Sequence, residues 1–273
     1  MRRYLVSLSV SLMLFASCGG NQSGVSGEAD ADSVAVDSTA VDSLAETVLP
    51  KAADELFDDF IFNFAANKRL QMSRIDFPLT IVDGAQKEML AKNQWKMEYF
   101  FMRQGYYTLL FDSEQHMEVV KDTSVCQAVV EKIYFERQQV KQYLFSRRGG
   151  LWRLTEIRKI PVNQSHNATF LTFYHQFATD MGYQTAHLNS TVHFVGPDPD
   201  DDFSQMEGMI TPDTWEAFAP ELPSKVIYNI IYGTPMKEGN QKVFVMRGIA
   251  NGLELEMTFR KKGGDWKLTK LTT

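Results

Sequence analysis

The residues with the clearest capacity for chemistry are Gln139, Lys141 and Tyr143, which occupy every second position of one alternating segment. Side chains two residues apart in a β-strand point to the same face of a sheet. An amide, an ammonium group and a phenol would therefore line one surface, and we expect a cavity or an interdomain contact there. The alternative is a strand displaced by one residue, which would turn the side chains between them inward instead.

Other residues that often do chemistry form no catalytic or metal-binding pattern. His187 and His193 lie an even number of positions apart on one expected strand, but no further ligand follows at a spacing that would suit zinc. The acidic run at 198–202 lacks the glycine and the terminal glutamate of a calcium loop, which favours a solvated turn. Cys126 stands among small and apolar residues and is expected in the core. The sequence therefore predicts no catalytic residue, no metal and no cofactor.

An internal repeat divides the chain into two similar halves. The pattern Phe-x-x-Phe-x-x-x-Phe-Ala begins at Phe57 and again at Phe170, 113 positions later. The pattern Gly-Gly-x-Trp-x-Leu-Thr begins at Gly149 and again at Gly263, 114 positions later. Two landmarks at opposite ends of one unit share nearly the same spacing, which predicts tandem domains. The predicted boundaries are 52–160 for the first domain, 161–166 for a linker and 167–273 for the second domain.

The repeat also shows how the halves differ at the candidate site. At an offset of 114, Gln139 and Lys141 correspond to Leu253 and Leu255. The first half thus carries polar side chains where the second half is apolar. We therefore expect any polar cavity or contact in the first half alone.

The spacing of apolar residues predicts similar elements in both halves. Phenylalanine at i, i+3 and i+7 is the buried stripe of an amphipathic helix, so each half should begin with one. An alternating run, a Gly-Gly pair and a second apolar run predict a strand, a tight turn and a strand. This order is typical of an α+β domain whose helices cover one face of a curved antiparallel sheet. The remaining predictions are helices at 68–74, 85–94 and 212–219 and strands at 75–82, 106–111, 125–135, 186–195, 225–232 and 242–249.

The segment from Phe57 to Leu79 and the two Gly-Gly-x-Trp-x-Leu-Thr turns resemble an uncharacterised family of Bacteroidales lipoproteins. That resemblance implies two tandem NTF2-like or cystatin-like domains, each with helices packed on a curved sheet around a cone-shaped pocket. Some NTF2-like proteins are isomerases or dehydratases that use Asp, His and Tyr in this pocket. The matching residues belong to the core and the turns, so the resemblance carries the fold and no activity.

The first 17 residues have the parts of an export signal, namely two arginines, a short apolar run and small residues before Cys18. Residues 14–18 resemble a bacterial lipobox, which implies removal of the signal at 1–17 and a lipid anchor on Cys18. Ordinary secretory cleavage near Ser17 is the alternative. No acid follows Cys18 directly, which favours an outer-membrane anchor that faces the periplasm over one at the outer surface of the cell envelope.

Residues 18–51 are acidic and poor in large apolar side chains, which predicts a disordered tether. Within this tether an Asp-Ser pair followed by a small or apolar residue recurs every five positions. The repeated triplet resembles the O-glycosylation sequon of Bacteroidota, and it makes Ser33, Ser38 and Ser43 the candidate acceptors. A low-complexity linker without sugar is the alternative.

The folded part has nearly balanced charge, so nucleic acid is not an expected partner. Without a catalytic pattern, the sequence favours an envelope lipoprotein that binds a small ligand or an envelope protein. The alternative is a small-molecule enzyme of the isomerase or dehydratase kind that uses a cone pocket. Exposed sheet faces often pair, so a homodimer is a further expectation.

Overall fold

The computed structural model describes residues 54–198, 200–235 and 238–273. Among these residues, no helix is long and apolar enough to cross a membrane. Several sequence predictions lie outside the described residues, namely the signal at 1–17, the tether at 18–51, the anchor Cys18 and the acceptors Ser33, Ser38 and Ser43.

The first half begins with two short helices and continues into strands. In α1 (Phe57–Ala66) the side chains of Phe57, Phe60 and Phe64 are buried, as their spacing predicts. The Asn67 side chain accepts a hydrogen bond from the Leu70 backbone and caps α2 (Lys68–Arg74). Short 3₁₀ helices cover Lys92–Gln94, Phe100–Arg103 and Gln115–Lys121. The strands are β1 (Ile75–Asp83), β2 (Gln86–Leu90), β3 (Tyr106–Phe111), β4 (Gln127–Tyr134), β5 (Gln139–Arg148) and β6 (Leu151–Pro161).

The second half repeats this order. The helix α3 (Ala168–Phe177) buries the second phenylalanine stripe, and the Asp180 side chain caps α4 (Met181–Ala186). Short 3₁₀ helices cover Val162–Gln164 and Trp215–Ala217. The strands are β7 (Leu188–Asp198), β8 (Asp201–Ile210), β9 (Val226–Tyr232), β10 (Gln241–Gly248), β11 (Glu254–Lys262) and β12 (Asp265–Thr272).

Both predicted Gly-Gly hairpins are confirmed, as β5–β6 and β11–β12. All four turn glycines have positive φ, from 59° at Gly149 to 98° at Gly264. Glycine adopts such angles without a steric cost, because it lacks a Cβ atom. The first turn joins β6 to β5, which carries the candidate site residues, and the register of this pair shifts between Leu144 and Phe145.

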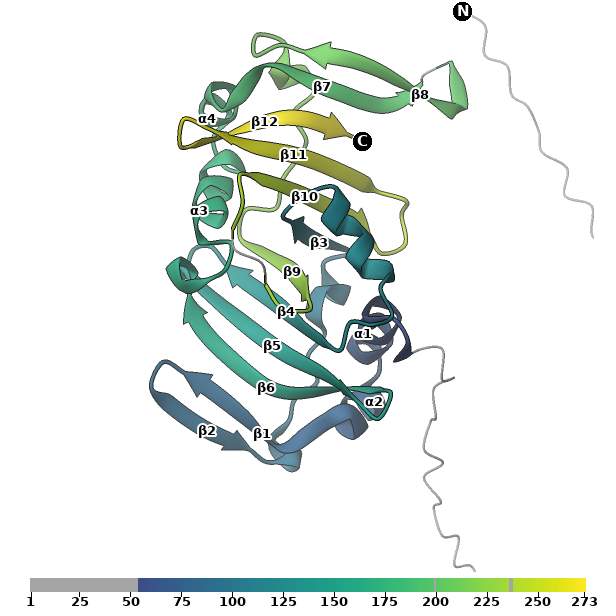
Figure 1. Cartoon of the computed structure of the whole chain (residues 1–273), viewed down its shortest axis with the longest axis vertical. Helices are drawn as coiled ribbons and strands as arrows, with labels where there is room; N and C mark the ends of the chain where they lie inside the picture. Colours follow the sequence, from purple (N-terminus) through teal and green to yellow (C-terminus); the bar gives the residue numbers. More distant parts are fainter. Residues whose placement is uncertain (1–53, 199, 236–237) are drawn as a thin grey trace, which may run out of the picture. The chain divides into compact units, whose positions relative to one another are not determined.

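The described strands form two six-stranded sheets that exchange one strand with each other (Figure 1). The order in the first sheet is β2-β1-β6-β5-β4-β9, and in the second it is β3-β10-β11-β12-β7-β8. Thus β9 of the second half pairs with β4, and β3 of the first half pairs with β10. The exchanged strands also meet, since Leu110 N donates to Asn229 Oδ1 at 2.8 Å. Each sheet is therefore completed by the other half of the chain.

The hydrophobic cores are shared in the same way. The first core joins the phenylalanines of α1 with Tyr228 and Ile230 of β9. The second core joins the phenylalanines of α3 with Ile133 of β4 and Val140 of β5. The predicted domain ranges 52–160 and 167–273 thus describe the sequence repeat, whereas each core takes residues from both ranges. Their boundaries remain predictions.

The α+β class is confirmed, but several element predictions are wrong. The helix expected at 85–94 is mostly β2, which pairs with β1 after a turn at Gly84. The open edge of β1 offers backbone hydrogen bonds that outweigh the local helix preference of Lys, Glu, Met and Leu. The helix expected at 212–219 is reduced to the 3₁₀ turn Trp215–Ala217. The sheets are mixed rather than antiparallel, because β1 runs parallel to β6 and β7 runs parallel to β12.

Two further differences concern the second half. The strand expected from Ala186 begins at Leu188, because Ala186 still belongs to α4. The strand β8 was not predicted, since its acidic start at 201–202 carries no alternating apolar pattern. It forms by pairing with β7 along the sheet edge.

Candidate functional site

Lys141 and Tyr143 share one face of β5, next to the buried Phe145. The Tyr143 hydroxyl donates a hydrogen bond to Glu98 Oε2, and Lys141 Nζ lies 3.6 Å from the same oxygen. Gln139 is partly buried at the start of the strand, and its side chain makes no hydrogen bond to another described residue. The structure therefore brings together two of the three candidate residues. That they serve a function stays a prediction.

The side chains between them lie on the opposite face of the sheet. Val140 is buried in the second core, and Gln142 Nε2 donates to Glu131 Oε1 at 2.9 Å. Both faces of β5 are therefore covered, because the face that carries Val140 packs against the second half of the chain.

Glu98 holds this polar cluster together, and sequence reasoning missed it. Lys132 Nζ lies 3.5 Å from Glu98 Oε1, on the other side of the carboxylate from Lys141. Burial favours the protonated carboxyl, but the Tyr143 hydrogen bond and the two lysines outweigh it and hold the pKa of Glu98 below its usual value. Glu98 lies between two 3₁₀ helices in a segment without regular structure, so no periodic pattern marks it.

A cavity of about 490 Å³ lies beside this cluster, between the first half and β9 of the second half. At its edge the guanidinium carbon of Arg103 stacks 3.7 Å from the centre of the Tyr99 ring. No carboxylate among the described residues pairs with Arg103. We call this cavity the charged pocket, and it is lined by Met97, Glu98, Tyr99, Phe100, Arg103, Gln104, Lys132, Val226 and Tyr228.

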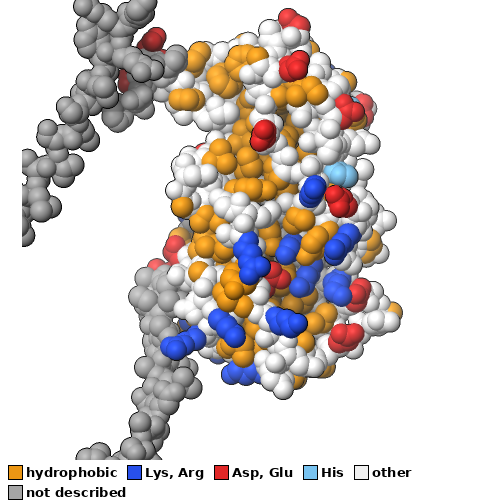
Figure 2. Space-filling model, turned by 180° about the vertical axis from the view of Figure 1, so that it is seen from behind, with side chains coloured by type: hydrophobic (Ala, Val, Ile, Leu, Met, Phe, Trp, Pro, Cys, Tyr) orange, Lys and Arg blue, Asp and Glu red, His pale blue; other side chains and the backbone are white. Residues whose placement is uncertain are grey.

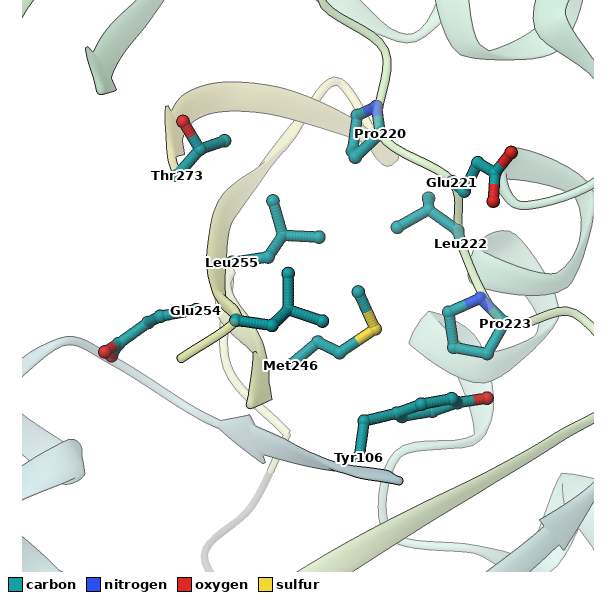
Figure 3. Close-up of a pocket in the computed structure, with 10 residues that line it drawn as sticks. Tyr106, Pro220, Glu221, Leu222, Pro223, Met246, Glu254, Leu255 and Thr273 are labelled. Atoms are coloured by element: carbon teal, nitrogen blue, oxygen red, sulfur yellow. The ribbon is translucent and has the colours of Figure 1, made fainter. Parts of the chain in front are cut away.

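A second cavity, of about 520 Å³, lies on the second sheet (Figure 3). Met246, Leu255 and Leu222 point into it, and the ring of Tyr106 closes one side. The carboxylates of its two glutamates point away, and that of Glu254 pairs with Arg247 at 3.0 Å. Burial raises the pKa of the Tyr106 hydroxyl, so this group stays neutral. We call this cavity the apolar pocket, and it is lined by Tyr106, Pro220, Glu221, Leu222, Pro223, Met246, Leu253, Glu254, Leu255 and Thr273.

The two pockets occupy equivalent places in the two halves. At the offset of 114 found in the repeat, Lys132 corresponds to Met246, and both line a pocket. Lys141 beside the charged pocket likewise corresponds to Leu255 in the apolar pocket. Gln139, Lys141 and Tyr143 are not themselves among the residues that line the charged pocket, and the sequence comparison did not point to Lys132 or Glu98, which do line it.

Comparison with known proteins places the chain in a family. Residues 36–273 match the family described as Domain of unknown function (DUF4348). The chain belongs to this family. The crystal structure of an NTF2-like protein from Bacteroides fragilis is similar, with 38% sequence identity and a TM-score of 0.72 over 81% of this chain and 96% of that one. A comparison with curated proteins found no match. This DUF4348 chain is thus NTF2-like in fold, as the core and turn residues implied.

A second polar cluster in this DUF4348 chain is closed to ligands. Lys242 is fully buried, and its ammonium group donates to Asp112 Oδ1 and Asn167 Oδ1. His166 Nε2 lies 3.5 Å from the other oxygen of Asp112. The cavity beside these groups holds about 10 Å³, which is roughly the space of one water molecule. The cluster therefore stabilises the junction between the halves and has no room for a substrate.

The remaining sequence candidates do not converge on a site. His187 packs on Tyr183 in a stacked geometry, and His193 Nε2 lies 3.2 Å from Glu207 at the surface. No group of three or more His, Cys, Asp or Glu among the described residues is placed to hold a metal. Cys126 is exposed, so the core position expected for it is wrong. It precedes β4, in which Ala128 is the first buried residue.

Glu131 is a buried carboxyl whose replacement tests the junction between the two sheets. It lies opposite Asn229 in the β4–β9 pair and accepts hydrogen bonds from Gln142 and Asn229. Burial outweighs these donors and raises the pKa of Glu131. As the pH rises from the usual pKa to the folded one, the unfolded chain loses its proton first, so stability falls.

We therefore expect Glu131→Gln to stabilise the protein by roughly 1–2 kcal/mol at neutral pH and to flatten this pH dependence. The Gln142 amide can turn over to accept a hydrogen bond from the new amide. Chemical denaturation between pH 4 and pH 8 measures the effect, with exposed Glu88→Gln as the control. A Glu131→Gln variant less stable than the parent chain at neutral pH would contradict this account.

Proposed function

We propose that this chain is an envelope-anchored lipoprotein whose folded part binds a small apolar ligand without catalysing a reaction. The observation that carries the proposal is the apolar pocket. Its volume of about 520 Å³ lies within the range of roughly 300–1,000 Å³ that is typical of small-molecule sites. Its inward-pointing side chains are those of Met246, Leu255 and Leu222. Such a lining gains affinity by removing apolar surface from water.

The same pocket argues against the isomerase or dehydratase alternative. General acid–base catalysis needs a titratable side chain within hydrogen-bond reach of the reacting atom. Among the described lining residues, the titratable groups are the outward-pointing Glu221 and Glu254 and the hydroxyl of Tyr106. The pKa of Tyr106 is raised, so its hydroxyl is a weaker acid than usual. Binding without chemistry is therefore the function that the geometry of the apolar pocket supports best.

A charged side chain in the apolar pocket tests the binding function. We expect Leu222→Lys to weaken binding of the neutral probe N-phenylnaphthylamine by at least about tenfold, because the ammonium group would lose its hydration in the pocket. Leu222 lies on a partly exposed loop, so the fold should tolerate the change. Probe fluorescence measures the affinity, and Met209→Lys, at a side chain 65% exposed on β8, is the matched control. Unchanged binding in Leu222→Lys, or no binding by the parent chain, would overturn the proposal.

The lipid anchor on Cys18 and the tether complete the proposed function. They are supported by the lipobox-like residues 14–18, by the acidic segment that follows and by the similarity to a Bacteroides protein. Acyl chains on Cys18 would hold the protein on the outer membrane, facing the periplasm. The native partners would be the membrane and a small envelope ligand or protein. A second copy of the chain, in a homodimer, would be a further partner.

The intact mass of the protein extracted from its own envelope tests the anchor and the tether. Acylation predicts a mature chain that begins at Cys18 with added acyl mass, and Cys18→Ser should abolish both features. Glycosylation predicts further mass that disappears when Ser33, Ser38 and Ser43 are replaced by alanine. A mature chain without acyl mass would remove the anchor from the proposal.

A further inference from the structure

The charged pocket has more positive charge than its own carboxylate can neutralise. Glu98 is the carboxylate among its lining residues, and it is shared between Lys132 and Lys141 at 3.5 and 3.6 Å. Both distances exceed a normal hydrogen bond. The Tyr228 hydroxyl is a further partner of the Lys132 ammonium group, but it carries no charge that would neutralise the lysine. Arg103 adds a third cation without a carboxylate partner among the described residues. An anionic group would balance this excess.

Arg103 is held in a position that suits such a group. Its guanidinium lies 3.7 Å from the Tyr99 ring centre, and this stacking orients the planar fork while leaving its N–H groups free. A guanidinium fork matches the two oxygens of a carboxylate or a phosphate. Figure 2 shows a wider concentration of Lys and Arg on the lower half of one face, where Figure 1 places β1, β2, β5 and β6.

The charged pocket and the apolar pocket adjoin each other. Gln104 lines the first and Tyr106 lines the second, and two residues span at most about 7 Å of chain. On the facing segment, Val226 lines the charged pocket and Pro223 lines the apolar pocket. Gln104 Nε2 donates to Val226 O at 3.2 Å, so the two segments touch where the pockets meet. The two pockets therefore lie on either side of this contact, and an elongated ligand that crosses it would reach both.

From these observations we infer that the ligand is an anionic amphiphile, with its acidic head at Arg103 and Lys132 and its hydrocarbon chain in the apolar pocket. The inference rests on the proposed function for the position of the chain and adds the class of ligand and the site of its head. The contrast between the two halves explains why both are needed. The second half supplies Met246 and Leu255 for apolar contact, and the first half supplies cations at the equivalent places.

The test compares dodecanoate with dodecanol, which has the same chain and no charge. We expect the parent protein to bind dodecanoate at least about tenfold more tightly, because a charge-assisted hydrogen bond contributes beyond the shared chain. Arg103→Gln should reduce this preference several-fold and leave dodecanol unchanged. Arg103 is exposed, so the variant should fold, and Lys132→Met, which installs the residue of the equivalent position 246, gives a second measurement. Arg260→Gln, at an exposed arginine of β11, is the matched control.

The possible results separate this inference from the proposed function. Equal affinity of the parent protein for dodecanol and dodecanoate would overturn the acidic head and leave the apolar site intact. Failure to bind dodecanol or N-phenylnaphthylamine would overturn the proposed function itself. Butyrate supplies the head without the chain. If butyrate bound as tightly as dodecanoate and left N-phenylnaphthylamine in place, the pockets would be two separate sites, which would also overturn the inference.

Discussion

A chain that ends after residue 166 is expected to have no stable monomeric fold, although it contains a whole copy of the sequence repeat. Such a fragment lacks β9, which completes the first sheet by pairing with β4 over seven residue pairs. It also loses Tyr228, Ile230 and Tyr232 from the first core. Each of these side chains contributes roughly 2 kcal/mol of burial, and together they amount to a large part of the roughly 5–15 kcal/mol by which domains are stable.

Mixing the two fragments should restore the native structure. The fragment at 167–273 needs β3, just as the first fragment needs β9, so the pair should form a one-to-one complex with the far-ultraviolet and amide NMR spectra of the intact chain. The first fragment alone has one other route to a folded state. Two copies could dimerise if β3 of each copy paired with β4 of the other, since β3 and β9 hold equivalent places at the edges of the two sheets. Sedimentation separates these cases. A folded monomer of either fragment, with cooperative unfolding, would show that the exchange is not required.

Arg74→Ala is expected to lower the free energy of unfolding by about 3–5 kcal/mol, because it leaves a buried carboxylate without its cation. Asp54 is 1% exposed, and Arg74 binds both of its oxygens, at 2.7 and 3.0 Å. Asp54 also accepts a hydrogen bond from the Trp152 backbone, so it cannot move toward water without releasing β6. The pair thus ties the start of the first half to the Gly-Gly hairpin. Urea denaturation measures the loss.

Two controls identify the unpaired charge as the cause. The double variant Asp54→Leu with Arg74→Met should be more stable than Arg74→Ala, because it removes the buried charges together. Arg158→Ala breaks an exposed pair with Glu156 and should change stability by less than about 1 kcal/mol. If Arg74→Ala cost no more than Arg158→Ala, the buried pair would not be a major contribution to the fold.

The sequence by itself determined the local elements and the duplication. The phenylalanine stripes of α1 and α3 follow from helical periodicity, and the Gly-Gly turns follow from backbone sterics, so both can be found without knowing any long-range contact. The offset between the repeats also paired Lys141 with Leu255, and a function for the polar position stays a prediction. Helix-forming residues at 85–94 misled the prediction because the free edge of β1 selected a strand.

Only the tertiary structure decided which half completes which sheet. β3 and β9 are both short apolar strands, so either sequence is compatible with either sheet edge. The choice depends on contacts between residues at least 92 positions apart. The partner of Lys132 and Lys141 was hidden for the same reason. Glu98 lies in an irregular segment, and it meets the lysines because the fold lays that segment across β4 and β5. Periodicity identifies the face of a strand, whereas the group that covers this face is set by long-range packing.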